Sequence, residues 1–223
     1  MKTIYWNVDT QFDFMRNDES FSGKLAIPSA REIESNLEKL TKHAAQEDIT
    51  VVNTADWHTW DSREISDTPD FKETFLPHCI MGSKGAQYIP ATKPAKPYTI
   101  DWQDKEFYAE RVNNTREIVL YKDEFDAFHP TGAPHTDKVI DIINPDRVIL
   151  YGVATNVCVD FAVRGLLARG KEVYVVKDAI KELPGDIEPI YAAWEKLGAK
   201  FTTTEEVVKH ATCDCYATVS SAR

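Results

Sequence analysis

Short runs of apolar and β-branched residues recur along the chain, with room for a helix between one run and the next. Each run is nearly continuous and lacks the polar alternation of a half-exposed strand, which is typical of strands buried on both faces of a parallel sheet. The predicted strands are residues 3–8, 50–54, 117–121, 147–151 and 172–176, with a weaker one at 199–203.

Segments with the apolar spacing of helices lie between these runs. A capping-box pattern at Ser29 and Glu32 indicates the start of the first helix. Further helices are predicted at about 136–143, after Thr155 and at about 188–197. This alternation of strands and helices predicts an α/β fold with a three-layer, doubly wound, mostly parallel sheet of about six strands and helices on both faces.

One long stretch departs from the alternation. Residues 57–115 contain few periodic segments and are rich in proline. A connection of that length inside a compact domain usually carries function or short helices of its own. We therefore predict a single domain over residues 1–223 with a loop-rich excursion at about 57–115. The role of its 87–115 part, as a lid or as a contact with another subunit, stays open.

The composition excludes several classes of protein. The 223 residues include 36 Asp+Glu against 26 Lys+Arg, a formal net charge of −10, and 43% of them are hydrophobic. The apolar fraction is enough for a core, and the acidic balance argues against binding to a nucleic-acid backbone. No apolar run is long enough to span a membrane, and the N-terminus lacks the apolar part of a signal peptide. We expect a cytoplasmic protein that binds neither nucleic acid nor membrane; a homo-oligomer stays open.

Chemically active side chains follow three of the predicted strands. Asp9 follows the first, Lys122 follows the third, and Cys158 stands at the start of a helix after the fourth. Because ligands bind beyond the carboxyl ends of parallel strands, we expect these side chains to meet there. A thiol at a helix N-terminus, beside an ammonium and a carboxylate that can take its proton, is an activated nucleophile. The N–H groups of Ala154 and Cys158 could donate to an oxyanion. The alternative is that Cys158 is a small core residue.

A second group has the composition of a metal site. Asp56 and His58 would point the same way from an extended segment, and His78 follows twenty residues later. Two imidazoles and a carboxylate form a common ligand set for zinc, iron or manganese. A further oxygen could come from a nearby carboxylate, first from Glu64 and otherwise from Asp61 or Asp67. The alternative is a turn with an exposed histidine.

Several other polar residues are interpreted without a function. Asp13 is expected to make a structural contact in a turn, Asp123 to belong to a solvated loop, and His43 to lie at the surface. The chain has four cysteines, too few for a disulfide framework at this length, so reduced thiols are expected. Cys213 and Cys215 are interpreted as a thiol pair and not as a site for a soft metal.

Five stretches, in this order, resemble the nicotinamidase branch of the isochorismatase-like cysteine hydrolases. They are VDTQFDF, TADWH, LPHCIMGSKGAQ, YKDEFDAF and GVATNVCV. The resemblance extends from about Ile4 to Val176. It implies Asp9, Lys122 and Cys158 as the catalytic residues, and it implies that the metal ligands are Asp56, His58, His78 and Glu64. One departure is Asn156, which stands where nicotinamidases more often have Asp.

The resemblance also implies a pocket and a reaction. Phe14 and Phe75 would line the pocket for an aromatic ring, and a cis peptide would join Val153 to Ala154. One divalent metal ion is expected, with zinc first and iron or manganese as alternatives. The implied reaction is hydrolysis of nicotinamide to nicotinate and ammonia through a Cys158 thioester, as in the salvage of pyridine nucleotides. The alternatives are a relative acting on another small amide, ureido or carbamoyl compound, an isochorismatase-type hydrolase, or a non-catalytic binding protein.

Overall fold

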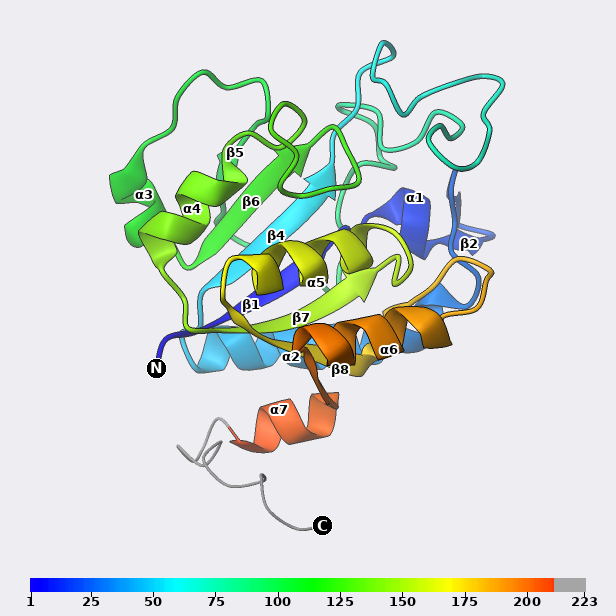
Figure 1. The fold of residues 1–223 in the computed structure, drawn as a ribbon. Coiled ribbons are helices and arrows are strands. Elements are labelled where there is room, and N and C mark those ends of the chain that lie inside the picture. The colour runs from blue at the N-terminus through cyan, green and yellow to red at the C-terminus, as the bar shows by residue number, and fades with distance from the viewer. Residues whose placement is uncertain (211–223) are drawn as a thin grey trace.

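The computed structural model describes residues 1–210, and its centre is a seven-stranded sheet with the strand order β5-β6-β4-β1-β7-β8-β9 (Figure 1). All pairs of neighbouring strands in this sheet are parallel. The strands are β1 Thr3–Val8, β4 Val51–Asp56, β5 Tyr98–Ile100, β6 Glu117–Lys122, β7 Arg147–Val153, β8 Glu172–Lys181 and β9 Lys200–Thr202. The short strands β2 Asn17–Asp18 and β3 Phe21–Ser22 form a separate hairpin. The predicted α/β class and parallel sheet are confirmed.

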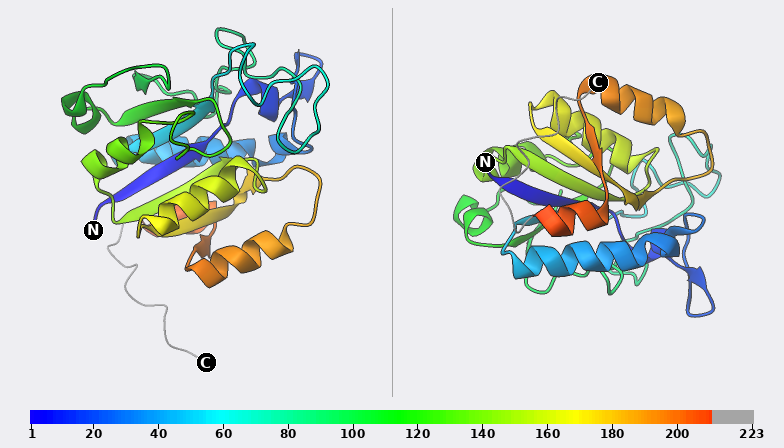
Figure 2. Two further views of the ribbon diagram at one scale, coloured as in Figure 1. Left: turned by 45° about the horizontal axis from the view of Figure 1, so that its top comes forward. Right: turned by 90° about the horizontal axis from the view of Figure 1, so that it is seen from below.

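Helices cover both faces of the sheet, as Figure 2 shows from two sides. The helices are α1 Phe12–Met15, α2 Glu34–Gln46, α3 Ala109–Asn113, α4 Thr136–Ile143, α5 Cys158–Ala168, α6 Glu188–Leu197 and α7 Thr204–His210, with a 3₁₀ turn η1 at Ala30–Ile33. Helices α2 and α7 pack together on one face, where Leu37 and Val207 join the same apolar cluster. Helices α4, α5 and α6 contribute Val139, Val159 and Trp194 to the cluster on the other face. The result is a three-layer arrangement.

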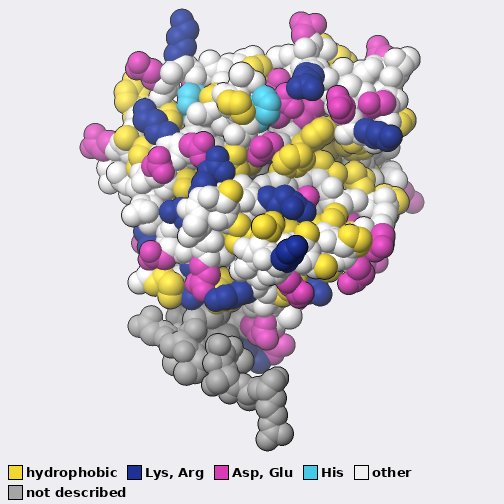
Figure 3. Space-filling view, viewed as in Figure 1, with side chains coloured by type: hydrophobic (Ala, Val, Ile, Leu, Met, Phe, Trp, Pro, Cys, Tyr) yellow, Lys and Arg dark blue, Asp and Glu magenta, His cyan; other side chains and the backbone are white. Residues whose placement is uncertain are grey.

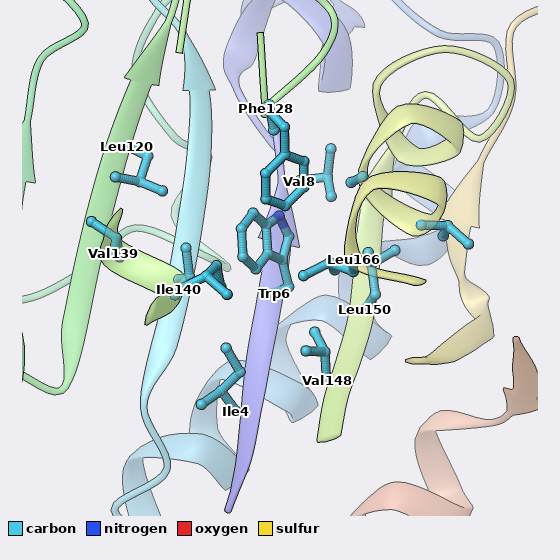
Figure 4. Close-up of a cluster of buried hydrophobic side chains, with 14 of the residues drawn as sticks. Ile4, Trp6, Val8, Leu120, Phe128, Val139, Ile140, Val148, Leu150 and Leu166 are labelled. Atoms are coloured by element: carbon cyan, nitrogen blue, oxygen red, sulfur yellow. The ribbon is translucent and has the colours of Figure 1, made fainter. Parts of the chain in front are cut away.

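The larger cluster is centred on β1. Trp6 is fully buried and stacks on Phe128 with ring centroids 5.8 Å apart, between side chains of α4, α5 and the neighbouring strands (Figure 4). Burying a large apolar side chain contributes roughly 1.5–3 kcal/mol. The central strands are thereby held firmly, which fixes the positions of the residues that follow their carboxyl ends.

The start of α2 differs from the prediction. Ser29 has a left-handed backbone (φ 57°) and makes no side-chain cap, and the 3₁₀ turn η1 precedes the α-helix. The predicted capping box is therefore wrong, although Leu37, Leu40 and Ala44 have the apolar spacing of a helix and are buried on its inner face. The apolar spacing is set by packing on the sheet, whereas the cap depends on the path by which the chain enters the helix.

The excursion at 57–115 consists mostly of turns and loops, and its first part lies over the carboxyl ends of the strands (Figure 1). It also contains the short helix α3, as its length indicated, and the edge strand β5, which its pattern did not predict. Cys213 and Cys215 lie outside the described residues. Within residues 1–210, no helix is both long enough and apolar enough to cross a membrane.

Candidate active site

The predicted catalytic residues meet at one edge of the sheet. Asp9 directly follows β1, Lys122 is the last residue of β6, and Cys158 is the first residue of α5, shortly after β7. Asp56 ends β4 and pairs in register with Lys122 on the adjacent strand. Parallel strands with a common register place these side chains side by side.

Lys122 contacts the other members of the group. Its Nζ lies 3.0 Å from Oδ2 of Asp9 and 3.7 Å from Sγ of Cys158, and it also donates to Oδ1 of Asp56. The main-chain oxygen of Glu124 accepts a further hydrogen bond of 3.1 Å from the same Nζ. The acid, the ammonium and the thiol are thus within reach of one another, and all three residues are buried.

A close approach between β1 and β7 makes this arrangement possible. Gly152 has φ +123°, and a Cβ at this position would lie 2.1 Å from the main-chain oxygen of Val8, so a larger residue would push the strands apart. The peptide bond between Val153 and Ala154 is cis, as the resemblance implied. Thr54 donates a 2.7 Å hydrogen bond to Oδ1 of Asp9, which leaves Oδ2 facing Lys122.

Burial dominates the electrostatics of the triad. Burial raises the pKa of the Cys158 thiol well above its usual range, against the opposing charge of Lys122. Burial likewise raises the pKa of Asp9, which Lys122 lowers and Asp56 raises further. Burial would lower the pKa of Lys122, but Asp56 and Asp9 hold it well above the usual range. The resting nucleophile is therefore a thiol beside a carboxyl group that has become a better proton acceptor.

Two N–H groups are available beside the thiol. Ala154 and Cys158 flank a tight turn in which the N–H groups of Val157 and Val159 donate to the oxygen of Ala154 at 3.0 and 3.1 Å. Among the described residues, the N–H groups of Ala154 and Cys158 themselves have no protein acceptor outside regular helix and strand bonding. They are free to donate to a negatively charged oxygen next to Sγ.

The predicted metal ligands form a second buried cluster that shares Asp56 with the first. Oδ2 of Asp56 lies 3.7 Å from Nε2 of His58 and 3.7 Å from Nε2 of His78, and Oε2 of Glu64 lies 3.9 Å from Nε2 of His58. Nε2 of His58 and Oε2 of Glu64 are buried without a hydrogen-bond partner. Orphaned buried donors and acceptors of this kind are uncommon unless an ion or water completes them. Two imidazole nitrogens and two carboxylate oxygens fit a divalent transition metal.

The opposite atom of each ligand is held by the protein. Nδ1 of His78 bonds the Leu76 oxygen at 2.8 Å, and Oε1 of Glu64 accepts a 2.6 Å bond from the N–H of Phe125. Nδ1 of His58 bonds Oδ1 of Asp123 at 2.9 Å. Such outer contacts fix the tautomer and orientation of a metal ligand. They turn Nε2 of both imidazoles toward Asp56.

The charges of this cluster also favour a cation. Burial would raise the pKa of Asp56, but Lys122, His58 and His78 hold it well below its usual range. Burial would lower the pKa of His58, but Asp123 and Asp56 raise it to about 9. Burial and then Asp56 raise the pKa of Glu64 to about 9. His58 and Glu64 therefore tend to hold protons beside Asp56, and a metal cation could replace that positive charge.

Two contributors to this site were missed by the sequence analysis. Asp123, interpreted as part of a solvated loop, is only 14% exposed and also accepts a bond from the Ser62 hydroxyl. Gln11 is fully buried; its Nε2 donates to the oxygen of Asp56 at 2.7 Å and its Oε1 accepts the N–H of Asp56 at 2.8 Å. The sequence did offer a signal for Gln11: it has a long amide side chain and stands two residues after Asp9, beyond the end of a predicted strand. Asp13 makes the expected structural contact, accepting the N–H of Cys79 at 2.7 Å.

Both clusters open on one cavity. Cys158 and Asp56 line it together with Phe14 and Phe75, and its volume is about 20 Å³. The ring of Phe14 lies 5.5 Å from that of His78, and the ring of Phe75 lies 6.3 Å from it, both edge to face. The two predicted pocket aromatics are thus at the boundary between the thiol and the metal-ligand cluster. A molecule that enters this cavity therefore meets both clusters at once.

The chain is similar to known proteins over most of its length. It matches the Isochorismatase domain over residues 6–206. It is 25% identical to a nicotinamidase of Escherichia coli (strain K12) over 182 residues, which cover 75% of this chain and 79% of that protein.

Solved structures share the fold. A pyrazinamidase of Pyrococcus horikoshii in complex with zinc has a TM-score of 0.70 at 20% identity, over 91% of this chain and 99% of that one. An N-carbamoylsarcosine amidase from Thermoplasma acidophilum has a TM-score of 0.68 at 22% identity, over 92% and 98% of the two chains. The chain therefore belongs to the isochorismatase family and, with nicotinamidases among its relatives, is an amide-hydrolysing enzyme, as its sequence predicted.

Proposed function

We propose that the protein is a nicotinamidase, a metal-dependent cysteine amidohydrolase that converts nicotinamide and water to nicotinate and ammonia. One observation carries the proposal: Cys158, from the buried triad with Asp9 and Lys122, and Asp56, from the cluster with His58 and His78, line the same cavity. The nicotinamidase relative from Escherichia coli adds support. A carboxamide on a nitrogen-containing ring has two polar ends, one suited to the thiol and one to the metal-ligand cluster.

The first half of the reaction forms a thioester. Asp9 takes the proton from the Cys158 thiol, and the ammonium of Lys122 stabilises the thiolate. The thiolate attacks the carboxamide carbon, and the N–H groups of Ala154 and Cys158 bind the resulting oxyanion. Asp9 then gives the proton to the nitrogen, so that the C–N bond breaks and ammonia leaves.

The second half releases the acid. Asp9, again a carboxylate, takes a proton from a water molecule, which attacks the thioester carbon. The C–S bond breaks, nicotinate leaves, and the proton returns to the sulfur of Cys158. Asp9 therefore serves as acceptor and donor in turn, for which its raised pKa is suited.

The substrate ring would lie between Phe14 and Phe75. Asp56, His58, His78 and Glu64 would hold one divalent ion, zinc in the first place, and this ion supplies a Lewis-acidic binding point for the ring nitrogen. Positioning the ring in this way brings the carboxamide to the thiol and lowers the entropic cost of the attack.

Ammonia release from nicotinamide, with a panel of other small carboxamides and ureido compounds, tests the proposal. Cys158→Ala should abolish turnover while nicotinate still binds. The control is Cys79→Ala, which changes a second buried thiol that faces the oxygen of Gly85 and leaves the triad intact. Appreciable activity of Cys158→Ala would refute the nucleophile. A purified enzyme that contains no metal and prefers a ureido compound would refute the substrate.

A further inference from the structure

A second and larger hollow lies directly outside the catalytic cavity. Its volume is about 740 Å³, and it is bounded by the excursion, by the segment after β6 and by the start of α5. Figure 3 shows this face, with hydrophobic side chains gathered right of centre and acidic and basic side chains around them. Five residues line both spaces and form a collar between them: Leu25, Phe75, Phe125, Val157 and Leu183.

A row of aromatic rings leads through this collar to the surface. Phe75 and Phe125 meet edge to face at 5.6 Å, Phe71 lies 6.3 Å from Phe75, and Phe161 stacks 6.4 Å from Phe125. The outer two rings are exposed although they are apolar: Phe71 is 62% exposed and Phe161 is 41% exposed. Exposed apolar rings that line a concave surface are a feature of binding sites.

The position of Phe71 is imposed by the backbone. Its φ is +56°, a left-handed conformation that bulky residues rarely adopt. The carboxylate of Asp70 holds the turn by accepting the N–H groups of Lys72, Glu73 and Thr74, each at 2.9 Å. Residues whose backbone is held in an unfavourable conformation by the surrounding contacts occur most often at functional sites. Here the strain keeps an aromatic ring at the rim of the hollow.

The opposite side of the collar is fixed by Asn156. Its Nδ2 donates to the oxygen of Leu183 at 3.1 Å, and its Oδ1 accepts the N–H of Leu183 at 3.0 Å. An aspartate could accept the N–H but could not donate to the oxygen unless it were protonated. The departure from the more usual Asp thus has a structural role, because it holds a collar residue in place between the two spaces.

The two spaces differ in size, so they can bind different parts of a substrate. A space of about 20 Å³ has room for little more than a water-sized group, since a single water needs about 10–15 Å³. A substrate ring between Phe14 and Phe75 must therefore reach the collar, to which Phe75 belongs. Any group attached to that ring has to continue into the outer hollow.

We propose that the outer hollow is a second substrate subsite, which binds an uncharged aromatic or apolar group attached to the ring of the reacting amide. The inference rests on the proposed amidase function and extends its substrate class. Phe71 and Phe161 would contact the two sides of that group. Charged residues of both signs line the hollow, and Arg63 pairs with Glu73 at 3.8 Å. The bases are Arg63 and Lys72, and the acids are Glu73, Glu124 and Asp126. The two signs nearly balance, which favours an uncharged group on the ligand.

The test compares nicotinamide with nicotinamides that carry a phenyl group on ring carbon 5 or 6. For at least one phenyl compound, we expect the wild-type enzyme to have a KM about tenfold lower than for nicotinamide. Phe161→Ser and Phe71→Ser should each lower kcat/KM for that compound by about tenfold and leave the value for nicotinamide within about twofold. Tyr108→Ser is the control, because Tyr108 is 72% exposed and does not line the hollow.

The outcomes separate the two proposals. Hydrolysis of nicotinamide without a preference for either phenyl compound would overturn the subsite and leave the proposed function standing. The same holds if the two Phe variants lose activity equally on all substrates, or if Tyr108→Ser behaves as they do. If no amide is cleaved, calorimetric binding of the same compounds to the wild-type protein decides. Binding of none of them would overturn both proposals, and tighter binding of a phenyl compound that Phe161→Ser abolishes would support the subsite alone.

Discussion

Replacing Lys122 with methionine tests the electrostatics of the site most directly. The Lys122 side chain is 2% exposed, and the carboxylates of Asp9 and Asp56 beside it are no more exposed than that. Lys122→Met keeps the length of the side chain and removes its charge. Two buried carboxylates are then left without their common counter-ion.

The expected cost follows from that burial. Removing one partner of a buried ion pair costs about 3–5 kcal/mol, because the remaining charge is uncompensated. For a chain of this size each kcal/mol lowers Tm by about 2–4 °C, so the variant should melt about 6–20 °C below the wild type. Lys42→Met is the control. Lys42 pairs with Glu38 at the surface, where both side chains are at least half exposed, and such pairs contribute about 1 kcal/mol at most.

The loss should depend on pH in a defined direction. Burial already raises the pKa of Asp9 in the wild type, and without Lys122 that pKa rises further. At a pH between the ordinary carboxyl pKa, near 4, and the raised value, Asp9 holds its proton in the folded state and has lost it in the unfolded chain. The folded state therefore loses stability as the pH rises through this range. The deficit of Lys122→Met should therefore be larger at pH 8 than at pH 5.

Urea unfolding followed by circular dichroism, with chelator present, measures both effects. Adding Asp9→Asn to Lys122→Met should recover part of the lost stability, because one of the two unpaired charges disappears. A deficit under about 1 kcal/mol at pH 8 would refute the reasoning. So would an equal deficit at both pH values.

Three further predictions concern residues around the site and the core. Asp123→Asn should weaken metal binding by about 10–100-fold in competition with a chelator, whereas Asp61→Asn, at an exposed position, should not; equal affinities would contradict the orienting role of Asp123. Gln11→Leu leaves buried main-chain groups of Asp56 without partners and should cost at least about 2 kcal/mol in urea unfolding; a cost below about 1 kcal/mol would show that they find others. Burial lowers the pKa of His43, so this residue should destabilise the wild type as the pH falls below about 6.5, where the unfolded chain takes up the proton more readily. The stability of His43→Gln relative to the wild type should therefore rise between pH 7 and pH 5, and an unchanged difference would contradict this.

The positions that the sequence predicted best are those that follow from strand geometry. Asp9 and Lys122 each come at the carboxyl end of a buried apolar run, and parallel strands bring such ends together. Cys158 was placed by the same rule at the start of a helix. His78 follows no long strand, so strand geometry did not place it beside Asp56; the residue types suggested it as a ligand and the motif resemblance implied it.

The errors arise where a distant segment decides the environment. Asp123 has a polar neighbourhood in the sequence, but the excursion brings His58 and Ser62 onto its carboxylate. His43 was expected at the surface and is 5% exposed, because α2 turns it toward β1, where its Nδ1 bonds the Tyr5 hydroxyl at 2.8 Å. Neither contact affects the local pattern of apolar and polar residues, so that pattern could not predict it. The edge strand β5 is three residues long, too short for a pattern to show.

Asp56 divides its two oxygens between neighbours with different tasks, one toward Lys122 and the other toward the imidazoles. Its replacement would disable ion binding and nucleophile chemistry in a single step. A variant that lost the metal through a change at His58 or His78 would still use Asp56, because that carboxylate and Asp9 together keep Lys122 charged. The evolutionary routes open to this site are set by that one shared carboxylate.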